Sequence, residues 1–128
     1  MRTQYSYKSR DRSLRAAYLR IIRASKGMHI TRKVIISLLQ EQPAPRFYIE
    51  PDTARVYIKN YKRYKGKSFK EAMVADLKEN LNRLKAENPD APQAWLYEEV
   101  VKQPAKSYYM SDHRIEEVIF NYSGRNGK

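Results

Sequence analysis

An eight-residue pattern that occurs twice constrains the fold of this chain more than any other feature of its sequence. The first copy is QPAPRFYI, from Gln42 to Ile49, and the second is QPAKSYYM, from Gln103 to Met110. Both copies start with Gln-Pro-Ala and continue through two aromatic residues to a bulky apolar residue, at a spacing of 61 positions. A recurrence of this kind indicates a duplicated structural unit.

The same spacing also relates the segments on either side of the pattern. It pairs Val34 with Trp95, Ile35 with Leu96, Leu39 with Val100, Ala54 with Ile115, Tyr57 with Val118, Ile58 with Ile119, Asn60 with Asn121 and Tyr61 with Tyr122. We therefore expect two quasi-repeated helix-link-helix units, over about 31–64 and 92–122. The register fails upstream of residue 31, and two similar pieces without common origin are the alternative.

Apolar residues recur with helical period along most of the chain. Leu14, Ala17, Tyr18 and Ile21, for example, follow the i, i+3, i+4, i+7 pattern. The predicted helices are about 13–25, 31–41, 51–64, 68–87, 92–102 and 112–122. We therefore expect a mostly α fold of about six helices in one domain over 13–122, with short extended segments at 46–49 and 107–110. Residues 1–12 are expected to form a flexible basic arm, and 123–128 a flexible tail.

Proline ends the helix before each link, because the residue before proline avoids the α region. The aromatic pairs Phe47–Tyr48 and Tyr108–Tyr109 are expected to wedge between helices, with one member of each pair buried. A base-stacking platform is the alternative for these tyrosines. A helix joined to a second helix by a short link is helix-turn-helix-like, although an eight-residue link is longer than the usual tight turn.

The segment 46–58 permits two structures. RFYI-EPDT-ARVYI has the pattern of a β-hairpin wing, but Ala54, Tyr57, Ile58 and Tyr61 also follow the helical period. Pro51 suits the first turn of a helix. We favour a short extended segment followed by a helix, with the hairpin left open.

Composition excludes several classes of site. The 128 residues contain no cysteine, which excludes disulfides, cysteine-based zinc sites and cysteine nucleophiles. No apolar run approaches the roughly 20 residues that span a bilayer, and the first residues have no apolar signal-peptide region. From these features we expect a cytoplasmic protein without a membrane partner.

Positive charge is concentrated in the first half of the chain. Residues 1–67 hold 17 Lys and Arg against 4 Asp and Glu, a net +13, whereas 68–128 hold 9 against 10. Such a field favours a polyanionic partner. Nucleic acid is the commonest, and an anionic membrane surface or an acidic protein fits the same charge.

One predicted helix, 51–64, carries a basic face. At 100° per residue, Arg55, Lys59, Lys62 and Arg63 fall within about a third of its circumference. We therefore predict nucleic-acid binding, DNA before RNA, with an ordinary solvated surface as the alternative. The candidate binding residues are Arg55, Lys59, Lys62, Arg63, Lys65, Lys67, Arg46, Arg12 and Arg15.

The second copy differs in charge at the matching positions. Glu116 replaces Arg55, and Phe120 replaces Lys59. The alternative function is therefore a protein–protein interaction or structural accessory role. In that case Trp95, Glu116 and Phe120 form the interface with a protein partner or a second copy, and the basic surface contacts an acidic partner.

Enzyme signatures are weak. Pro51-Asp52 and Asp76-Leu77-Lys78 superficially resemble the restriction-type nuclease signature, but that chemistry needs the second element on a strand, and here it lies in an amphipathic helix. His29 and His113 have no second metal ligand nearby in the sequence. We expect a protein that is not an enzyme and uses no cofactor.

The stretch PAPRFYIEPDTA, from Pro43 to Ala54, resembles a segment of small uncharacterised proteins from Bacteroidales mobile elements and phages. Those proteins often read Pro-Ala-Pro-Arg-Phe-Tyr, then an apolar residue, a capping residue and proline. Glu50 stands at the capping position, where serine would be the better cap. The resemblance implies a helix after Pro51 and a mobile-element or phage context, and it brings no established activity or catalytic residues.

Overall fold

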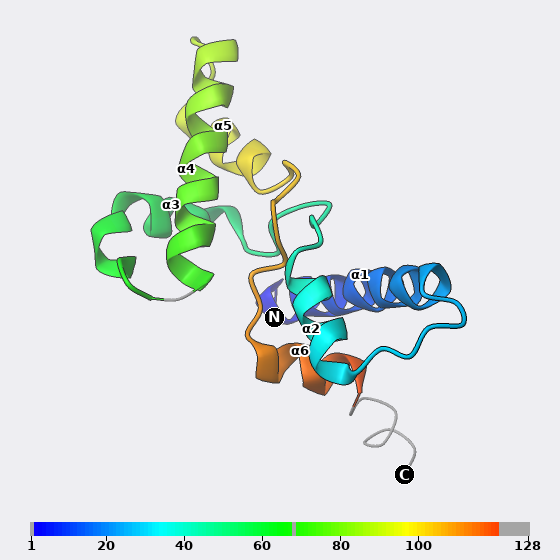
Figure 1. Cartoon of the computed structure of the whole chain (residues 1–128). Helices are drawn as coiled ribbons and strands as arrows, with labels where there is room; N and C mark the ends of the chain where they lie inside the picture. Colours follow the sequence, from blue (N-terminus) through cyan, green and yellow to red (C-terminus); the bar gives the residue numbers. More distant parts are fainter. Residues whose placement is uncertain (1, 68, 121–128) are drawn as a thin grey trace.

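Six α-helices and one 3-10 helix account for most of the chain. The computed structural model describes residues 2–67 and 69–120, with side chains from residue 7 onward (Figure 1). The helices are α1 (Arg2–Ala24), α2 (Arg32–Gln40), α3 (Pro51–Lys59), the 3-10 helix η1 (Tyr61–Tyr64), α4 (Phe69–Glu87), α5 (Gln93–Val100) and α6 (Asp112–Ile119). Within the described residues no strand forms, and the prediction of a mostly α fold with six helices is confirmed.

Local sequence explains where these helices begin. The Thr31 hydroxyl accepts a hydrogen bond from the Val34 N–H at 3.3 Å and caps α2, and Ser111 caps α6 in the same way through Arg114 at 3.1 Å. α3 begins with Pro51 in its first turn and has no side-chain cap. A helix therefore follows the first repeat pattern, and the alternative of a hairpin over 46–58 is wrong.

The N-terminal segment differs from its prediction, because α1 already begins at Arg2. No glycine or proline interrupts it, and Arg10 Nε lies 3.1 Å from Asp11 Oδ1, with both side chains mostly buried. Residues 2–12 are thus helical rather than an arm. Ser13, the first residue of the helix predicted over 13–25, lies inside α1. The predicted tail over 123–128 lies outside the described residues.

The prediction of one helix over 51–64 also needs correction. α3 ends at Lys59, and Asn60 leaves the helical region with φ −110° and ψ 33°. Its backbone N–H and its side-chain amide both donate to the Val56 carbonyl, at 3.0 Å and 2.9 Å, so this carbonyl of the last turn accepts two hydrogen bonds at the helix end. The chain continues as the 3-10 helix η1.

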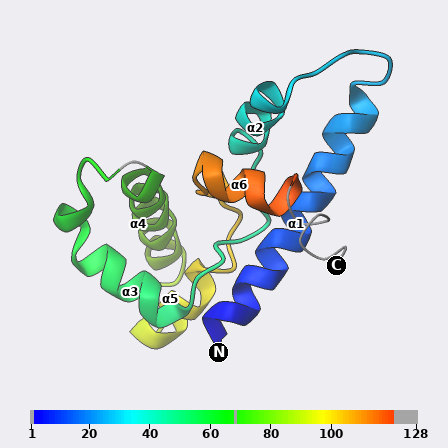
Figure 2. The same cartoon turned by 90° about the horizontal axis from the view of Figure 1, so that it is seen from below.

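The helices form two groups of three (Figures 1 and 2). α1, α2 and α6 pack together and are called the first lobe, and α3, α4 and α5 pack together and are called the second lobe. The first link, residues 41–50, and the second link, 101–111, cross between them. α3 therefore packs on the helices of the second copy, and α6 packs on those of the first.

We call the packing of α3 and α6 on the helices of the other copy the exchange. It contradicts the helix-turn-helix interpretation. α2 and α3 are consecutive in the chain, yet they do not contact each other. The first link runs on past Pro43 without helical structure, and it delivers α3 to the opposite lobe instead of folding it back on α2.

The two links meet at equivalent residues. The Ala44 N–H donates to the Ala105 carbonyl at 2.9 Å, and the Ala105 N–H donates to the Ala44 carbonyl at 3.0 Å, as an isolated antiparallel bridge. Ala44 and Ala105 are related by the spacing of 61. A residue that pairs reciprocally with its own equivalent lies at an approximate two-fold axis, as in an isologous dimer interface.

The aromatic side chains of the links obey the same symmetry. Phe47 stacks on Tyr109 with ring centroids 6.4 Å apart, and Tyr48 stacks on Tyr108 at 6.3 Å, each with an interplanar angle of 5°. Exchanging the two copies converts one stack into the other. Each such pair contributes about 0.5–1.5 kcal/mol beyond its buried area.

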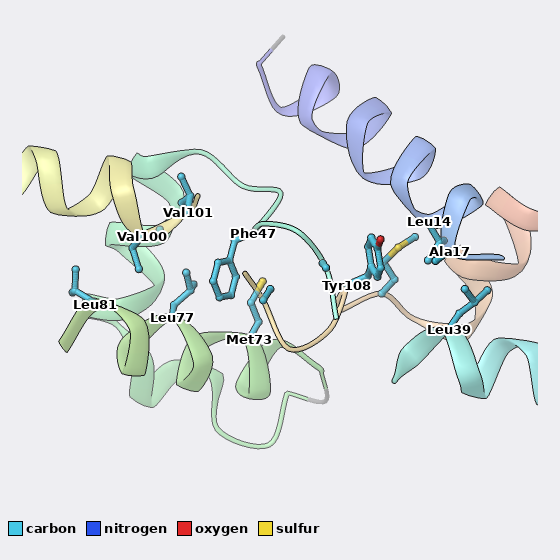
Figure 3. Packing of buried hydrophobic residues seen from close by; sticks show 14 of the residues in the cluster. Leu14, Ala17, Leu39, Phe47, Met73, Leu77, Leu81, Val100, Val101 and Tyr108 are labelled. Atoms are coloured by element: carbon cyan, nitrogen blue, oxygen red, sulfur yellow. The ribbon is translucent and has the colours of Figure 1, made fainter. Parts of the chain in front are cut away.

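The first aromatic residue of each link enters the core of the opposite copy (Figure 3). Phe47 lies beside Leu77 and Val100 in the second lobe, whereas Tyr108 lies beside Leu14 in the first. Phe47 is 2% exposed and Tyr108 6%. The prediction that one member of each aromatic pair is buried is confirmed, and burial of a ring of this kind contributes roughly 1.5–3 kcal/mol.

Loop length explains why the repeat fails upstream in the sequence. The connection before α2 spans residues 25–31, whereas that before α5 spans 88–92 and is two residues shorter. The register for α1 and α4 is therefore 63, which pairs Leu14 with Leu77, both fully buried. The structural repeat thus includes α1 and α4.

A matching pair of hydrogen bonds supports this register. The Ser25 hydroxyl donates to the Ile21 carbonyl at 2.8 Å, and the Asn88 amide donates to the Leu84 carbonyl at 3.0 Å. Both donors sit just after the helix end, and both satisfy a carbonyl of the last turn. The spacing of 63 relates the donor Ser25 to the donor Asn88, and the acceptor Ile21 to the acceptor Leu84.

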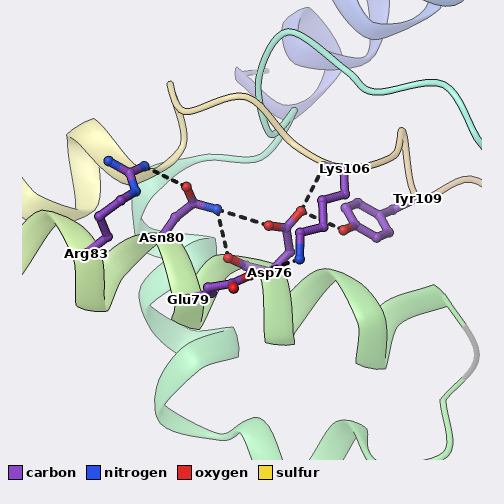
Figure 4. Close-up of polar contacts among 6 residues, drawn as sticks. All are labelled: Asp76, Glu79, Asn80, Arg83, Lys106 and Tyr109. Carbon is purple, nitrogen blue, oxygen red and sulfur yellow. Dashed lines mark hydrogen bonds and ion pairs between the residues drawn. The ribbon is translucent and has the colours of Figure 1, made fainter.

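A buried carboxylate holds the second link on α4 (Figure 4). Asp76 is 3% exposed and accepts hydrogen bonds from the Tyr109 hydroxyl at 2.6 Å, the Lys106 N–H at 2.9 Å and the Asn80 amide at 3.0 Å. Tyr109 has a φ of 56°, which is unusual for a residue other than glycine. Three donors satisfy the carboxylate and fix this backbone position.

The neighbouring tyrosine attaches the same link to the other lobe. Tyr108 contacts the first lobe, whereas Tyr109 contacts α4 of the second lobe. The Tyr108 hydroxyl is 2.5 Å from the Ser13 hydroxyl on α1. One link thus hydrogen-bonds to α1 of the first lobe and to α4 of the second lobe.

Replacement of the buried carboxylate is expected to destabilise the fold. Asp76→Ala leaves the Tyr109 hydroxyl and the Lys106 N–H without their acceptor, which costs about 2–4 kcal/mol in the free energy of unfolding. Urea unfolding followed by circular dichroism measures this change. Glu79→Ala is the control, because it removes only an exposed ion pair with Lys106 and is expected to leave stability nearly unchanged. Equal effects of the two substitutions contradict the assigned role of Asp76.

Alkaline pH is expected to destabilise the protein through the same tyrosine. Burial raises the pKa of Tyr109 above its ordinary value of 10.0, and the hydrogen bond to Asp76 raises it further. Above about pH 10 the unfolded chain releases this proton while the folded chain retains it, so the free energy of unfolding decreases as pH rises. Urea unfolding from about pH 8 to about pH 11 tests this decline. Tyr109→Phe should make it shallower without abolishing it, because burial also raises the pKa of Tyr108.

Candidate nucleic-acid interface

The segment from Arg55 to Lys67 is the most strongly basic part of the chain and is called the basic segment. Six of its 13 residues are Lys or Arg, and none is acidic. It comprises the end of α3, η1 and the connection to α4. In both views it lies on the side of the second lobe that faces away from the first lobe (Figures 1 and 2).

Three cations of this segment converge on one hollow. Lys59, Lys62 and Arg63 line an open depression of about 400 Å³, together with Asn60 and Tyr61. The turn at Asn60 brings η1 beside the last turn of α3 and creates this arrangement. All three cations are exposed, and none forms an ion pair with a carboxylate of the described residues.

This arrangement differs from the basic face predicted for 51–64. With one α-helix over these residues, Arg55 would lie on the same face as Lys62 and Arg63. Because α3 ends at Lys59, the last two cations project from a different helix. The structure gathers them with Lys59 around a hollow, whereas Arg55 lies further back on α3, with its Nε 3.5 Å from Asp52 Oδ1.

The other cations of the segment lie in the connection to α4. Lys65 and Lys67 are exposed on either side of Gly66, whose φ of 75° suits glycine. The Gly66 N–H donates to the Glu71 carboxylate at 2.9 Å and ties the connection to the first turn of α4. Ser68, the first residue of the helix predicted over 68–87, lies outside the described residues.

Aromatic side chains are interleaved with these cations. Tyr61 is exposed, and Lys78 Nζ of α4 lies 3.4 Å from its ring centroid. Tyr57 and Tyr64 form an edge-to-face pair with centroids 5.1 Å apart. The helical period of 51–64 predicted that Tyr61 lies on an apolar face, whereas Tyr61 lies beside the hollow. The alternation of Tyr with Lys and Arg in this segment was the available signal, whereas nothing in the sequence indicated Lys78.

The remaining candidate residues lie on other surfaces. Arg46 is half-buried in the first link, where its Nε donates to the Phe47 carbonyl at 3.1 Å. Arg12 and Arg15 belong to α1 in the first lobe, and α1 does not contact α3. The structure therefore does not bring these three residues to the basic segment.

The predicted protein-contact surface is not one surface either. Trp95 is 37% exposed on α5, and α5 does not contact α6. Phe120 packs inside the first lobe, edge-to-face with Tyr18 at 5.9 Å and 4.7 Å from the Arg32 guanidinium. Glu116 lies 3.8 Å from the same Arg32. Glu116 and Phe120 therefore already have partners within the chain.

Two further observations concern other kinds of site. In residues 2–67 and 69–120, no three His, Asp or Glu side chains gather as ligands for a metal ion. Over the same residues, every helix is too short or too polar to cross a bilayer. None of the protein-family models, curated proteins or solved structures compared with this chain matches it.

Proposed function

We propose that the protein binds nucleic acid without catalysing a reaction, and that the basic segment holds the phosphate backbone. The observation that carries the proposal is the convergence of Lys59, Lys62 and Arg63 on one hollow without a carboxylate partner. Lysine and arginine bind phosphates while condensed counterions are released, which favours binding at low salt. A mobile-element or phage context, implied by the resemblance of 43–54, is compatible with this function.

The contrast with the rest of the second lobe supports this assignment. Several of its other cations lie beside carboxylates, in the pairs Arg83–Glu87 at 3.4 Å, Lys102–Glu99 at 3.3 Å and Lys106–Glu79 at 2.9 Å. These pairs cancel much of the local field. The hollow keeps its positive potential, so an approaching polyanion is drawn to that side of the molecule.

The geometry favours contacts to the backbone over reading of the sequence. α3 turns Ala54 into the core, and η1 is only four residues long. Neither presents a long free helix to a major groove, which is the way a helix reads bases. Phosphate contacts position a protein without specifying sequence, so we propose sequence-independent binding, with DNA as the first polymer to test.

Removal of the three hollow cations is expected to weaken binding and reduce its salt dependence. For Lys59→Ala/Lys62→Ala/Arg63→Ala, the slope of log K against log[salt] on duplex DNA should fall by about 2 to 3, at 0.9 for each lost phosphate contact. Fluorescence anisotropy with a labelled random duplex over a series of salt concentrations measures affinity and slope together.

A variant of equal charge provides the control. Lys26→Ala/Lys33→Ala/Lys85→Ala removes three exposed cations outside the basic segment. It should retain most of the affinity and slope. If both triple variants lose the same amount, binding reflects net charge alone and the assignment to the hollow is wrong. Absence of salt-dependent binding in the wild-type protein, together with binding to polyglutamate, would indicate an acidic protein partner instead.

A further inference from the structure

A second basic hollow lies where the two lobes meet, and it is called the axial cleft. Its volume is about 290 Å³, and it is lined by residues of α1, α3, α4, α6 and both links. Five tyrosines contribute to its wall, namely Tyr7, Tyr48, Tyr57, Tyr108 and Tyr109. No carboxylate lines it within the described residues.

The cleft lies on the approximate two-fold axis, because equivalent residues line it from both copies. The register of 63 relates Tyr7 to Lys70, and the register of 61 relates Tyr48 to Tyr109. The cleft forms because α3 and α6 each pack in the lobe of the other copy, so that both links pass between the lobes. One of these equivalent pairs differs in chemistry, since the Tyr7 ring of the first copy stands where the second copy has Lys70.

The cations of the cleft fall into two classes. Arg10 and Arg114 have carboxylate neighbours, Asp11 at 3.1 Å and Glu117 at 2.9 Å. Arg46 and Lys70 form no ion pair in the described part of the chain, and each lies near a ring.

The ring contacts place both unpaired charges next to tyrosines. The Arg46 guanidinium is 5.7 Å from the centroid of Tyr48, and Lys70 Nζ is 5.1 Å from that of Tyr57. The cleft therefore offers flat aromatic walls and two positive charges without a carboxylate partner. A ligand that satisfies both must contain a planar ring system and an anionic group.

We propose that the axial cleft binds one unpaired nucleotide, with its base against the tyrosines and its phosphate held by Arg46 and Lys70. Base–aromatic stacking tolerates any base, and a cationic groove holds the backbone. The volume is near the lower end of the roughly 300–1,000 Å³ typical of small-molecule sites, so it suits a single nucleotide and excludes a duplex. As a site for nucleic acid this rests on the proposed function, since the nucleotide then belongs to a single strand. A free nucleotide offers the same chemistry.

Photo-crosslinking of the wild-type protein tests the proposal without any substitution. A single-stranded oligonucleotide that contains 5-iododeoxyuridine is irradiated with the full-length protein, and crosslinked residues are identified by mass spectrometry. Crosslinks are expected at Tyr7, Tyr48, Tyr57 or Tyr109. Crosslinks confined to Tyr61 overturn the proposal, because that ring lies in the basic segment.

Two variants measure the contributions of charge and ring. Arg46→Gln/Lys70→Gln should reduce the salt slope for a single strand by about 0.7 to 1.4, at about 0.7 for each phosphate contact that is lost, with no change for duplex. Lys33→Gln/Lys85→Gln, which removes the same charge elsewhere, should change neither. Tyr7→Ala alters an exposed ring and should weaken single-strand binding roughly 5- to 150-fold.

The outcomes separate this inference from the proposed function. If Arg46→Gln/Lys70→Gln and Tyr7→Ala bind a single strand like wild type, the cleft is not a nucleotide site, while binding through the hollow can still stand. If oligonucleotides fail to bind but thymidine monophosphate binds and requires Arg46 and Lys70, the proposed function fails and the cleft is a site for free nucleotide. If wild-type protein binds neither, both proposals are overturned.

Discussion

The reciprocal hydrogen bonding between Ala44 and Ala105 is the contact on which the arrangement of the helices depends. It joins the two links at their equivalent residues, and from this point each link carries its last helix into the opposite lobe. Neither lobe is complete without a helix from the other copy. The Val101 carbonyl at the end of α5 accepts from the Phe47 N–H at 2.9 Å, and the equivalent Gln40 carbonyl accepts from the Ser107 hydroxyl at 3.0 Å. Each link is thereby tied to the other copy, as the protomers of a domain-swapped dimer are tied, but within one chain.

Local signals in the sequence were sufficient to predict most helix limits. Thr31 and Ser111 are caps, Pro51 starts a helix, and the spacing of 61 identifies the links, because each of these depends on neighbouring residues alone. The exchange of α3 and α6 could not be predicted, since a helical face shows that a helix packs but not against which partner. The end of α3 at Asn60 was missed for a related reason: asparagine is tolerated within a helix, and it is the backbone angles of Asn60 in the structure that show that the helix stops there. The basic segment was found from charge, whereas its hollow depends on that turn.

The exchange also accounts for the opposite charges of α3 and α6. In the first lobe, Glu116 and Phe120 of α6 both lie against Arg32 of α2. The spacing of 61 places Gln93 at the position of Arg32 and Arg55 at that of Glu116. An acidic residue on α3 would therefore meet no cation on α5. Because α3 has no arginine to pair with on α5, it can carry exposed cations without losing a packing contact. The basic surface therefore lies on α3 and not on α6.

A similar asymmetry separates the two links and defines what the axial cleft can offer. Tyr109 is fixed by its hydrogen bond to the buried Asp76. The register of 63 places Ser13 at the position of Asp76, and its hydroxyl is already bonded to Tyr108. Tyr48, the equivalent of Tyr109, consequently has no hydrogen-bond partner for its hydroxyl within the described residues. The second link is thus held rigidly against both lobes by polar contacts, whereas the first presents a tyrosine with an arginine beside it. The second link therefore forms a rigid wall of the cleft, and the first link provides polar groups for a ligand. A cleft built in this way can bind a ligand without a loss of stability of the protein.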